Sequence, residues 1–195
     1  MFRSGLGLLG CVAALTTPPV SYASAPLCPL VIAGGALEDG TADVYAAFIA
    51  SLEGDGPIVI VPSASGEPYQ STQAMVERFT RYGVPVERIV GAKLAQVDDP
   101  ETPDRDESRW ALNGADPELV EILQDASGIW FTGGDQARTT ALLMPEGQET
   151  PTLKAIRSAC ARGAVIGGTS AGAAIMSDPM LTGGESLAAL LGETD

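Results

Sequence analysis

Short apolar runs alternate with segments of helical spacing along most of the chain. The apolar runs are rich in β-branched and aliphatic residues, as buried strands are, and they lie at 30–33 (LVIA), 58–61 (IVIV), 86–90, 129–132 (IWFT) and 164–166. The segments of helical spacing lie at 44–52, 69–82, 117–125, 135–143, 151–162 and 171–176. Strands that are apolar throughout are covered on both faces, and their alternation with helices implies right-handed crossovers. The pattern therefore predicts one α/β domain, a three-layer α/β/α sandwich with a mainly parallel sheet.

Residues 1–23 have the pattern of a secretory signal peptide. Arg3 is followed by an apolar stretch at 6–15 (LGLLGCVAAL), and small residues precede a cleavage site after Ala23. The stretch is shorter than the ~20 apolar residues that span a bilayer, so we expect no membrane span. The run Leu-Leu-Gly before Cys11 also resembles a lipoprotein signal, although the apolar stretch continues past that cysteine. We expect a periplasmic or extracellular protein whose single domain covers 24–195.

Two cysteines, Cys28 and Cys160, would remain after removal of the signal peptide. An oxidising compartment favours their pairing. Spacing along the chain does not show whether two Cα atoms come within reach of each other, and two separate buried thiols are the simpler interpretation. The sequence leaves the disulfide open.

The charge balance narrows the classes of function. The sequence has 25 Asp and Glu against 11 Lys and Arg, a formal charge of −14, and no histidine. No basic stripe offsets the acids, which argues against nucleic acid as a partner. Without histidine, zinc cannot be held through imidazole, and a Ser–His–acid triad cannot be completed within this sequence. No cofactor or metal is predicted.

The acidic stretch at 98–107 (DDPETPDRDE) has the composition of a possible calcium-binding loop. It lacks the central glycine and the glutamate offset of an EF-hand. Charge runs are usually solvated, so we expect a surface loop there.

The strongest chemical motif is Gly-Thr-Ser-Ala-Gly at 168–172, between a predicted strand and a helix of small residues. This is the context of a nucleophile elbow, in which a tight turn presents the serine hydroxyl at a helix N-terminus. Ser170 is then the candidate nucleophile, and the backbone N–H of Ala171 is one donor to an oxyanion. The alternative is a glycine-rich turn that only allows the helix to pack on the sheet.

A second turn, 132–136 (TGGDQ), also follows a predicted strand. Gly133 and Gly134 allow the backbone to approach a substrate closely, which makes Gly134 a second oxyanion donor. Asp135 fits an N-terminal helix cap, and the amide of Gln136 could hold a substrate amide or carboxylate. Weaker turns at 34–35 and 63–66 could line the same cleft.

Three segments, 31–35 (VIAGG), 129–136 (IWFTGGDQ) and 167–177 (GGTSAGAAIMS), together resemble the serine-peptidase family of cyanophycinase and aspartyl dipeptidase, with the last two favouring the cyanophycinase branch. The resemblance implies a fold akin to class I glutamine amidotransferases. It also implies hydrolysis of peptide or isopeptide bonds next to aspartate by a Ser–His–acid triad, as in the β-Asp-Arg polymer cyanophycin.

The resemblance assigns roles residue by residue. Ser170 matches the nucleophile, Gly134 and Ala171 the oxyanion hole, and Gln136 a substrate-binding glutamine beside Gly133 and Asp135. Glu185 lies about where the family has its acid. The family histidine would follow that acid, beyond residue 195, so we expect either a chain lacking the C-terminal portion of its domain or a natural inactive member.

The leading hypothesis is thus an exported serine peptidase that acts on an aspartate-containing peptide. A non-catalytic peptide-binding protein of the same fold is the alternative, and a general α/β-hydrolase esterase is the weakest. A homodimer is left open.

Overall fold

The computed structural model describes residues 28–35, 37, 41–178 and 180. Within this part of the chain, five parallel strands form one sheet in the order β1-β5-β4-β2-β3. The strands are β1 (Leu30–Ala33), β2 (Ile58–Val61), β3 (Ile89–Gly91), β4 (Gly128–Phe131) and β5 (Val165–Thr169). The predicted signal peptide and Glu185 lie outside the described residues.

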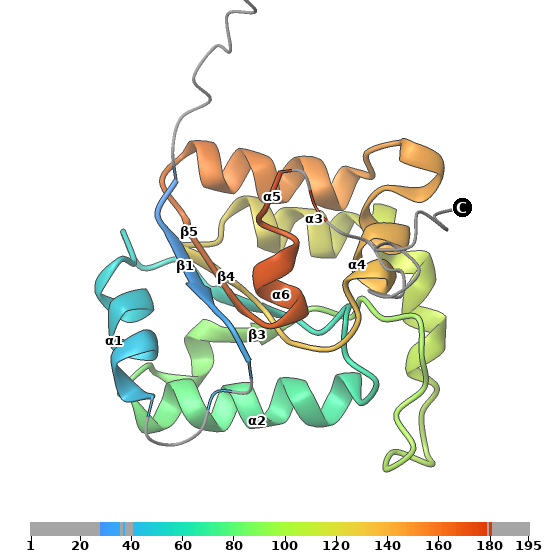
Figure 1. Cartoon of the computed structure of the whole chain (residues 1–195), viewed down its shortest axis with the longest axis horizontal. Coiled ribbons are helices and arrows are strands. Elements are labelled where there is room, and N and C mark those ends of the chain that lie inside the picture. Colours follow the sequence, from blue (N-terminus) through green and yellow to red (C-terminus); the bar gives the residue numbers. More distant parts are fainter. Residues whose placement is uncertain (1–27, 36, 38–40, 179, 181–195) are drawn as a thin grey trace, which may run out of the picture.

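Helices cover both faces of the sheet, which confirms the predicted three-layer architecture (Figure 1). One face carries α1 (Ala42–Ala50) and α2 (Pro68–Arg81), and the other carries α3 (Pro117–Gln124) and α5 (Pro151–Ala161). Two short helices follow the carboxyl ends of central strands: α4 (Gln136–Leu143) after β4 and α6 (Ala171–Ala174) after β5. Short 3₁₀-helices complete the connections at η1 (Val86–Arg88), η2 (Glu107–Ala115) and η3 (Pro145–Gly147).

Local sequence signals set where the helices begin. Asp116 caps α3 by accepting the backbone N–H of Glu118 at 3.0 Å, and proline follows at the first helical position. Thr150 caps α5 in the same way, through the N–H of Leu153 at 3.2 Å. These caps satisfy N–H groups that have no partner inside the helix.

Side chains that alternate along the strands divide the core into two clusters. Trp130 of β4 faces α1 and α2, where it packs against the rings of Phe48 and Phe79. Its neighbours Ile129 and Phe131 face the aliphatic cluster beneath α3 and α5. Central strands are therefore buried on both faces, as the apolar runs predict.

The edge strand β1 departs from that prediction. Leu30 is 49 % exposed and Ile32 is 58 % exposed, although both belong to a run of four apolar residues. The strand pairs with β5 on one side, and in the described part of the chain no strand pairs with its other side. The apolar run predicts cover on both faces of β1, but nothing among the described residues covers Leu30 and Ile32.

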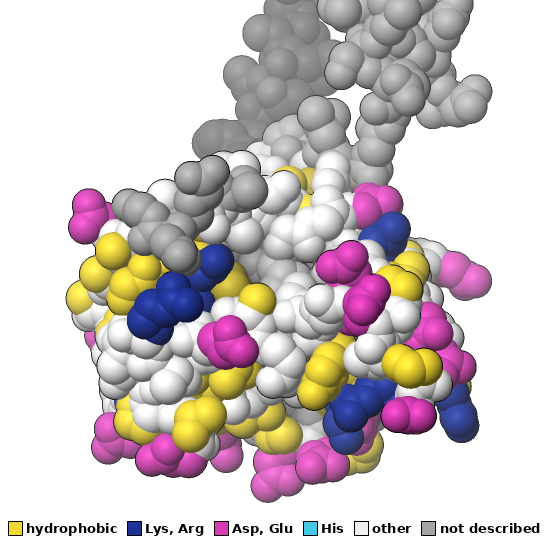
Figure 2. All heavy atoms as spheres, turned by 90° about the horizontal axis from the view of Figure 1, so that it is seen from below, with side chains coloured by type: hydrophobic (Ala, Val, Ile, Leu, Met, Phe, Trp, Pro, Cys, Tyr) yellow, Lys and Arg dark blue, Asp and Glu magenta, His cyan; other side chains and the backbone are white. Residues whose placement is uncertain are grey.

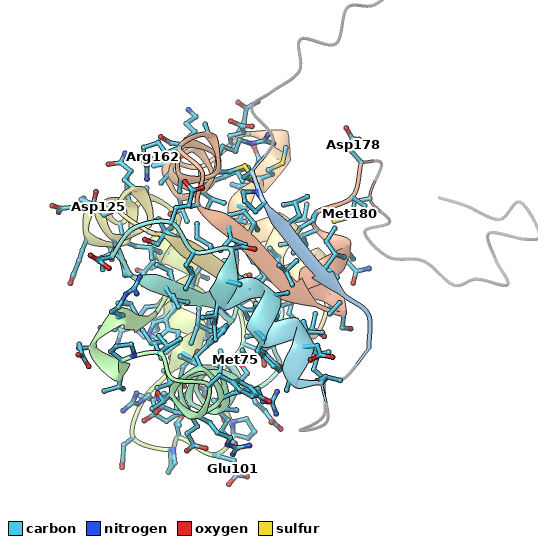
Figure 3. The ribbon with its side chains drawn as sticks, turned by 90° about the vertical axis from the view of Figure 1, so that its left-hand side faces the viewer. Met75, Glu101, Asp125, Arg162, Asp178 and Met180 are labelled. Atoms are coloured by element: carbon cyan, nitrogen blue, oxygen red, sulfur yellow. A yellow bond between two sulfur atoms is a disulfide. The ribbon has the colours of Figure 1, made fainter. Side chains whose placement is uncertain are left out.

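A disulfide joins Cys28 to Cys160, with the two Cα atoms 5.0 Å apart (Figure 3). Cys28 lies just before β1, and Cys160 lies in the last turn of α5. The interpretation of two separate thiols is therefore wrong, because folding brings together cysteines that are 132 residues apart.

The acidic segment 98–107 is anchored rather than simply solvated, which corrects the sequence-based expectation. Asp99 is 1 % exposed and Glu107 is fully buried. Burial alone would raise the pKa of the Asp99 carboxyl. However, the N–H groups of Gln70 and Glu101 and the side-chain amide of Gln70 donate to it and hold its pKa below the ordinary value. This carboxylate thereby fastens the loop to the first turn of α2.

Figure 2 views the molecule from the side of α2 and shows acidic side chains around its rim, with smaller groups of basic ones between them. No helix among the described residues is long and apolar enough to cross a membrane.

Candidate active site

Ser170 lies where β5 ends and α6 begins, in a backbone conformation that few non-glycine residues adopt. Its φ is 53° and its ψ is −118°. Such a conformation costs about 1–3 kcal/mol and persists only where surrounding contacts impose it. Here the N–H of Ser170 donates to the carbonyl oxygen of Ala33 at 3.0 Å, and its own carbonyl accepts from Ala173 and Ala174 at 2.9 Å. The backbone is held on both sides while the residue itself is exposed.

Two glycines allow α6 to pack directly on the main chain of the sheet. A Cβ on Gly172 would overlap the carbonyl oxygen of Phe131, and one on Gly168 would lie 2.5 Å from the carbonyl oxygen of Gly172. No side chain fits at either position without moving backbone. Close packing of α6 on the sheet therefore explains the glycines on both sides of Ser170 in the motif. The same packing requires the sharp turn at Ser170.

The turn after β4 lies against Ser170, as its position at the carboxyl edge of the sheet predicts. A Cβ on Gly133 would lie 3.3 Å from Cβ of Ser170 and 3.9 Å from its Oγ. The next residue, Gly134, has a φ of 137° and packs so tightly on Ala64 that a Cβ there would overlap the Ala64 carbonyl oxygen. Only glycine fits this combination of angle and contact.

Ala64 belongs to the 63–66 turn, which the structure brings to the same edge. Its carbonyl oxygen accepts the N–H of Asp135 at 2.9 Å and Nη1 of Arg138 at 3.2 Å. Ser63 adds a 2.8 Å hydrogen bond to Thr139 of α4. The 63–66 turn thus fixes the position of the turn that contacts Ser170.

Near Ser170, the backbone N–H groups of Gly134 and Ala171 are among those that have no acceptor in the described part of the chain. Ala171 is the first residue of α6, where N–H groups have no partner inside the helix. Free N–H groups at such a place can stabilise an oxygen that gains negative charge. The arrangement is chemically suited to attack on a carbonyl by the Ser170 hydroxyl.

The other predicted site residues lie around this centre. Asp135 caps α4, with its carboxylate accepting the N–H of Ala137 at 2.9 Å. Gln136 begins α4 and is half-buried. In the 34–35 turn, which follows β1, the carbonyl oxygen of Gly35 accepts a hydrogen bond from the hydroxyl of Thr169 at 2.7 Å. Glu185, the predicted acid, lies outside the described residues.

Sequence reasoning missed two supporting residues. Arg138 acts through a main-chain carbonyl 74 residues away, and no local pattern indicates such a contact. Ala33 contributes only its carbonyl oxygen, so its side chain carries no signal. Within the described part of the chain, no group of three Cys, Asp or Glu residues is placed to hold a metal ion.

Comparison with known proteins gives the family. Residues 111–188 match peptidase family S51. The chain is 37 % identical over 133 residues to the cyanophycinase of Geminocystis herdmanii, a match that covers 68 % of this chain and 42 % of the relative. The cyanophycinases of Synechococcus elongatus and Thermosynechococcus vestitus are each 32 % identical over 161 residues, covering 80 % of this chain and 44 % of theirs.

The match to each of these relatives thus covers less than half of the relative's length. The fold is also similar to that of a peptidase from an acI-B1 Actinobacterium, known from a crystal structure. The TM-score is 0.51 at 21 % identity, and the match covers 78 % of this chain and 58 % of the other. The chain therefore belongs to peptidase family S51 and is similar to its cyanophycinases.

Proposed function

We propose that this chain carries the nucleophile and oxyanion hole of an exported serine-type peptidase of cyanophycinase type, acting on peptide or isopeptide bonds next to aspartate. The observation that carries the proposal is Ser170, exposed in a strained turn that is followed by the free N–H of Ala171 and contacted by the turn that holds the free N–H of Gly134. Strained conformations of this kind are retained where function needs them. The cyanophycinase relatives suggest a β-Asp-Arg polymer as the substrate.

In this proposal, Oγ of Ser170 attacks the scissile carbonyl carbon and forms an ester, and the amine leaves with a proton. The N–H groups of Gly134 and Ala171 stabilise the oxyanion, and water then hydrolyses the ester. Gln136, with Gly133 and Asp135, holds the aspartate side of the substrate.

The base of the triad is not among these 195 residues, since the sequence contains no histidine. A histidine oriented by an acid, the role we assign to Glu185, would take the proton of Ser170. We therefore expect little or no hydrolysis by the 195-residue chain alone.

The Cys28–Cys160 disulfide supports export, because disulfides persist in oxidising compartments and are rare in the cytosol. Export would follow cleavage after Ala23, and the mature protein would begin at residue 24.

A chimera tests the proposal. Residues 24–180 of this chain are joined to the C-terminal portion of the Geminocystis herdmanii cyanophycinase, and release of β-Asp-Arg dipeptides from cyanophycin is measured. We expect hydrolysis that Ser170→Ala abolishes and Ser177→Ala leaves intact, because Ser177 is an exposed serine on the same segment whose hydroxyl only bonds Ala174. Hydrolysis that survives Ser170→Ala would overturn the assignment.

The absence of histidine from the sequence favours one second candidate, a non-catalytic protein that binds aspartate-containing peptides at the same turns. Calorimetric titration of the 195-residue chain with β-Asp-Arg dipeptide tests it. Binding by the chain, together with a folded chimera that binds but does not hydrolyse, would support this candidate over the enzyme.

A further inference from the structure

An uncharged apolar strip runs across the face of the sheet that α5 covers, at the β1 edge. Leu30 and Ile32 point to the same face of β1, where register places them beside Ile166 and Gly168 of β5. Ile166 is 6 % exposed and belongs to the core beneath α3 and α5, whereas Leu30 and Ile32 are half exposed or more. The core of this face thus continues to the edge of the sheet without a cover among the described residues.

The strip continues into a cavity of about 190 Å³ that is bordered by α4, α5 and the residues that follow α6. Its apolar lining includes Leu143, Ile156, Ile166, Ile175, Met176 and Met180. Ile166 belongs both to the cavity and to the strip. Met176 also connects the cavity to the strip. It lines the cavity, and its Cε lies 3.0 Å from where a Cβ on Gly168, the β5 neighbour of Ile32, would be.

We infer that this strip and cavity, defined by Leu30, Ile32, Ile166, Met176 and Met180, are the docking site of the chain's own leucine-rich segment at 187–191. Met180 lines the cavity, so the chain leaves the described fold from within this surface (Figure 3). Seven residues later the sequence Leu-Ala-Ala-Leu-Leu places leucines at 187, 190 and 191. If these residues were helical, that spacing would put the three leucines on one apolar side, which suits an uncharged strip.

Because the segment belongs to the same chain, it is favoured over a second copy of the chain as the occupant of the strip. A segment joined to its site by a few residues of the same chain has an effective concentration of about 1 mM there. A second copy would have to exceed that concentration or bind with more contacts. The edge strand β1 has only four residues, which limits what strand pairing between copies could add.

Hydroxyl-radical footprinting of the full chain, read by mass spectrometry, tests the inference without any need for hydrolysis. Leu112, which is 86 % exposed on η2, serves as the internal reference. If the segment docks, labelling of Ile32 relative to Leu112 is low in the native chain. In a Leu187→Ser/Leu190→Ser/Leu191→Ser variant it rises about fivefold, as expected when a buried residue becomes about half exposed.

The matched control is Ala189→Ser, which changes the opposite side of the same helical pattern and is expected to leave the labelling unchanged. Circular dichroism verifies that each variant is folded. Equal labelling of Ile32 in the native chain and the triple variant would overturn the inference. So would protection that appears only at high protein concentration together with a dimer in sedimentation, since a second copy would then cover the strip.

Discussion

The backbone N–H of Ser170 donates a 3.0 Å hydrogen bond to the carbonyl oxygen of Ala33. This bond ties the proposed nucleophile to the end of the edge strand β1. A second bond, from the hydroxyl of Thr169 to the carbonyl oxygen of Gly35, reinforces the connection at 2.7 Å. The conformation of the turn at Ser170 therefore depends on where β1 lies, and the disulfide at Cys28 holds the start of that strand.

Reduction of the disulfide should destabilise the fold and loosen β1. The bond closes a loop of 132 residues, and native disulfides typically contribute about 2–4 kcal/mol to the free energy of unfolding. Urea unfolding with and without reductant measures the difference, and hydrogen exchange locates it at 30–33. A Cys28→Ser/Cys160→Ser variant should be as unstable as the reduced protein and insensitive to reductant. Equal stability in both redox states would contradict the prediction.

Replacing Ser170 with glycine should stabilise the fold relative to Ser170→Ala. Both changes remove the hydroxyl, but only glycine adopts a φ of 53° with a ψ of −118° without strain. We expect the glycine variant to be more stable by about 1–2 kcal/mol. Thermal and urea unfolding compare the two variants directly. If alanine were equal or better, the turn would not be strained as described.

Gly134→Ala should be more damaging than an alanine at another glycine of positive φ. The added methyl would overlap the carbonyl oxygen of Ala64, which also accepts bonds from Asp135 and Arg138. We expect a loss of more than about 3 kcal/mol in the free energy of unfolding. Gly83→Ala is the control, since its φ is 91° but nothing lies within 4 Å, and it should cost about 1–2 kcal/mol. Similar losses for the two variants would argue against the tight contact at Ala64.

Asp99→Asn should reveal a pH-dependent contribution to stability. The pKa of Asp99 is lowered in the fold from its ordinary value of 3.8, so its carboxylate stabilises the protein above that pH. The contribution disappears as the pH falls through the lower folded value. We expect the variant to be about 1–2 kcal/mol less stable at pH 7 and the difference to shrink below pH ~4. Urea unfolding across this range tests the effect.

The matched control for that experiment is Asp104→Asn, an exposed acid of the same loop. It should change the free energy of unfolding by less than about 0.5 kcal/mol at either pH. A difference for Asp99→Asn that stays constant down to pH 3 would show that its hydrogen bonds to Gln70 and Glu101 do not depend on the charge.

Local patterns predict the central strands and the strand–turn–helix around Ser170 well, because each depends on residues close in the chain. The run at 58–61 is fully buried in β2, and the 168–172 motif forms the strand–turn–helix that its glycines require. The carboxyl ends of parallel strands meet at one edge, so the contact between Gly133 and Ser170 also follows from the order of elements.

Features that depend on distant partners are not predictable in this way. Asp99 is buried because its carboxylate finds the N–H of Gln70 across 29 residues, which a charge run does not indicate. Among the described residues Ile32 is exposed at the edge strand β1, and an apolar run looks the same at the edge as in the centre. The 3₁₀-helix at Glu107–Ala115 lacks the periodicity of an α-helix, so nothing in the pattern predicts it.

The most direct test of the central claim is to locate a covalent label on the nucleophile. The chimera and the 195-residue chain are each treated with diisopropyl fluorophosphate, which phosphorylates activated serine hydroxyls, and the modified peptide is identified by mass spectrometry. We predict a label on Ser170 in the chimera, and none in the 195-residue chain, which has no histidine to activate it. An active chimera that is labelled on another serine, or not labelled at all, would contradict the assignment of Ser170 as the nucleophile.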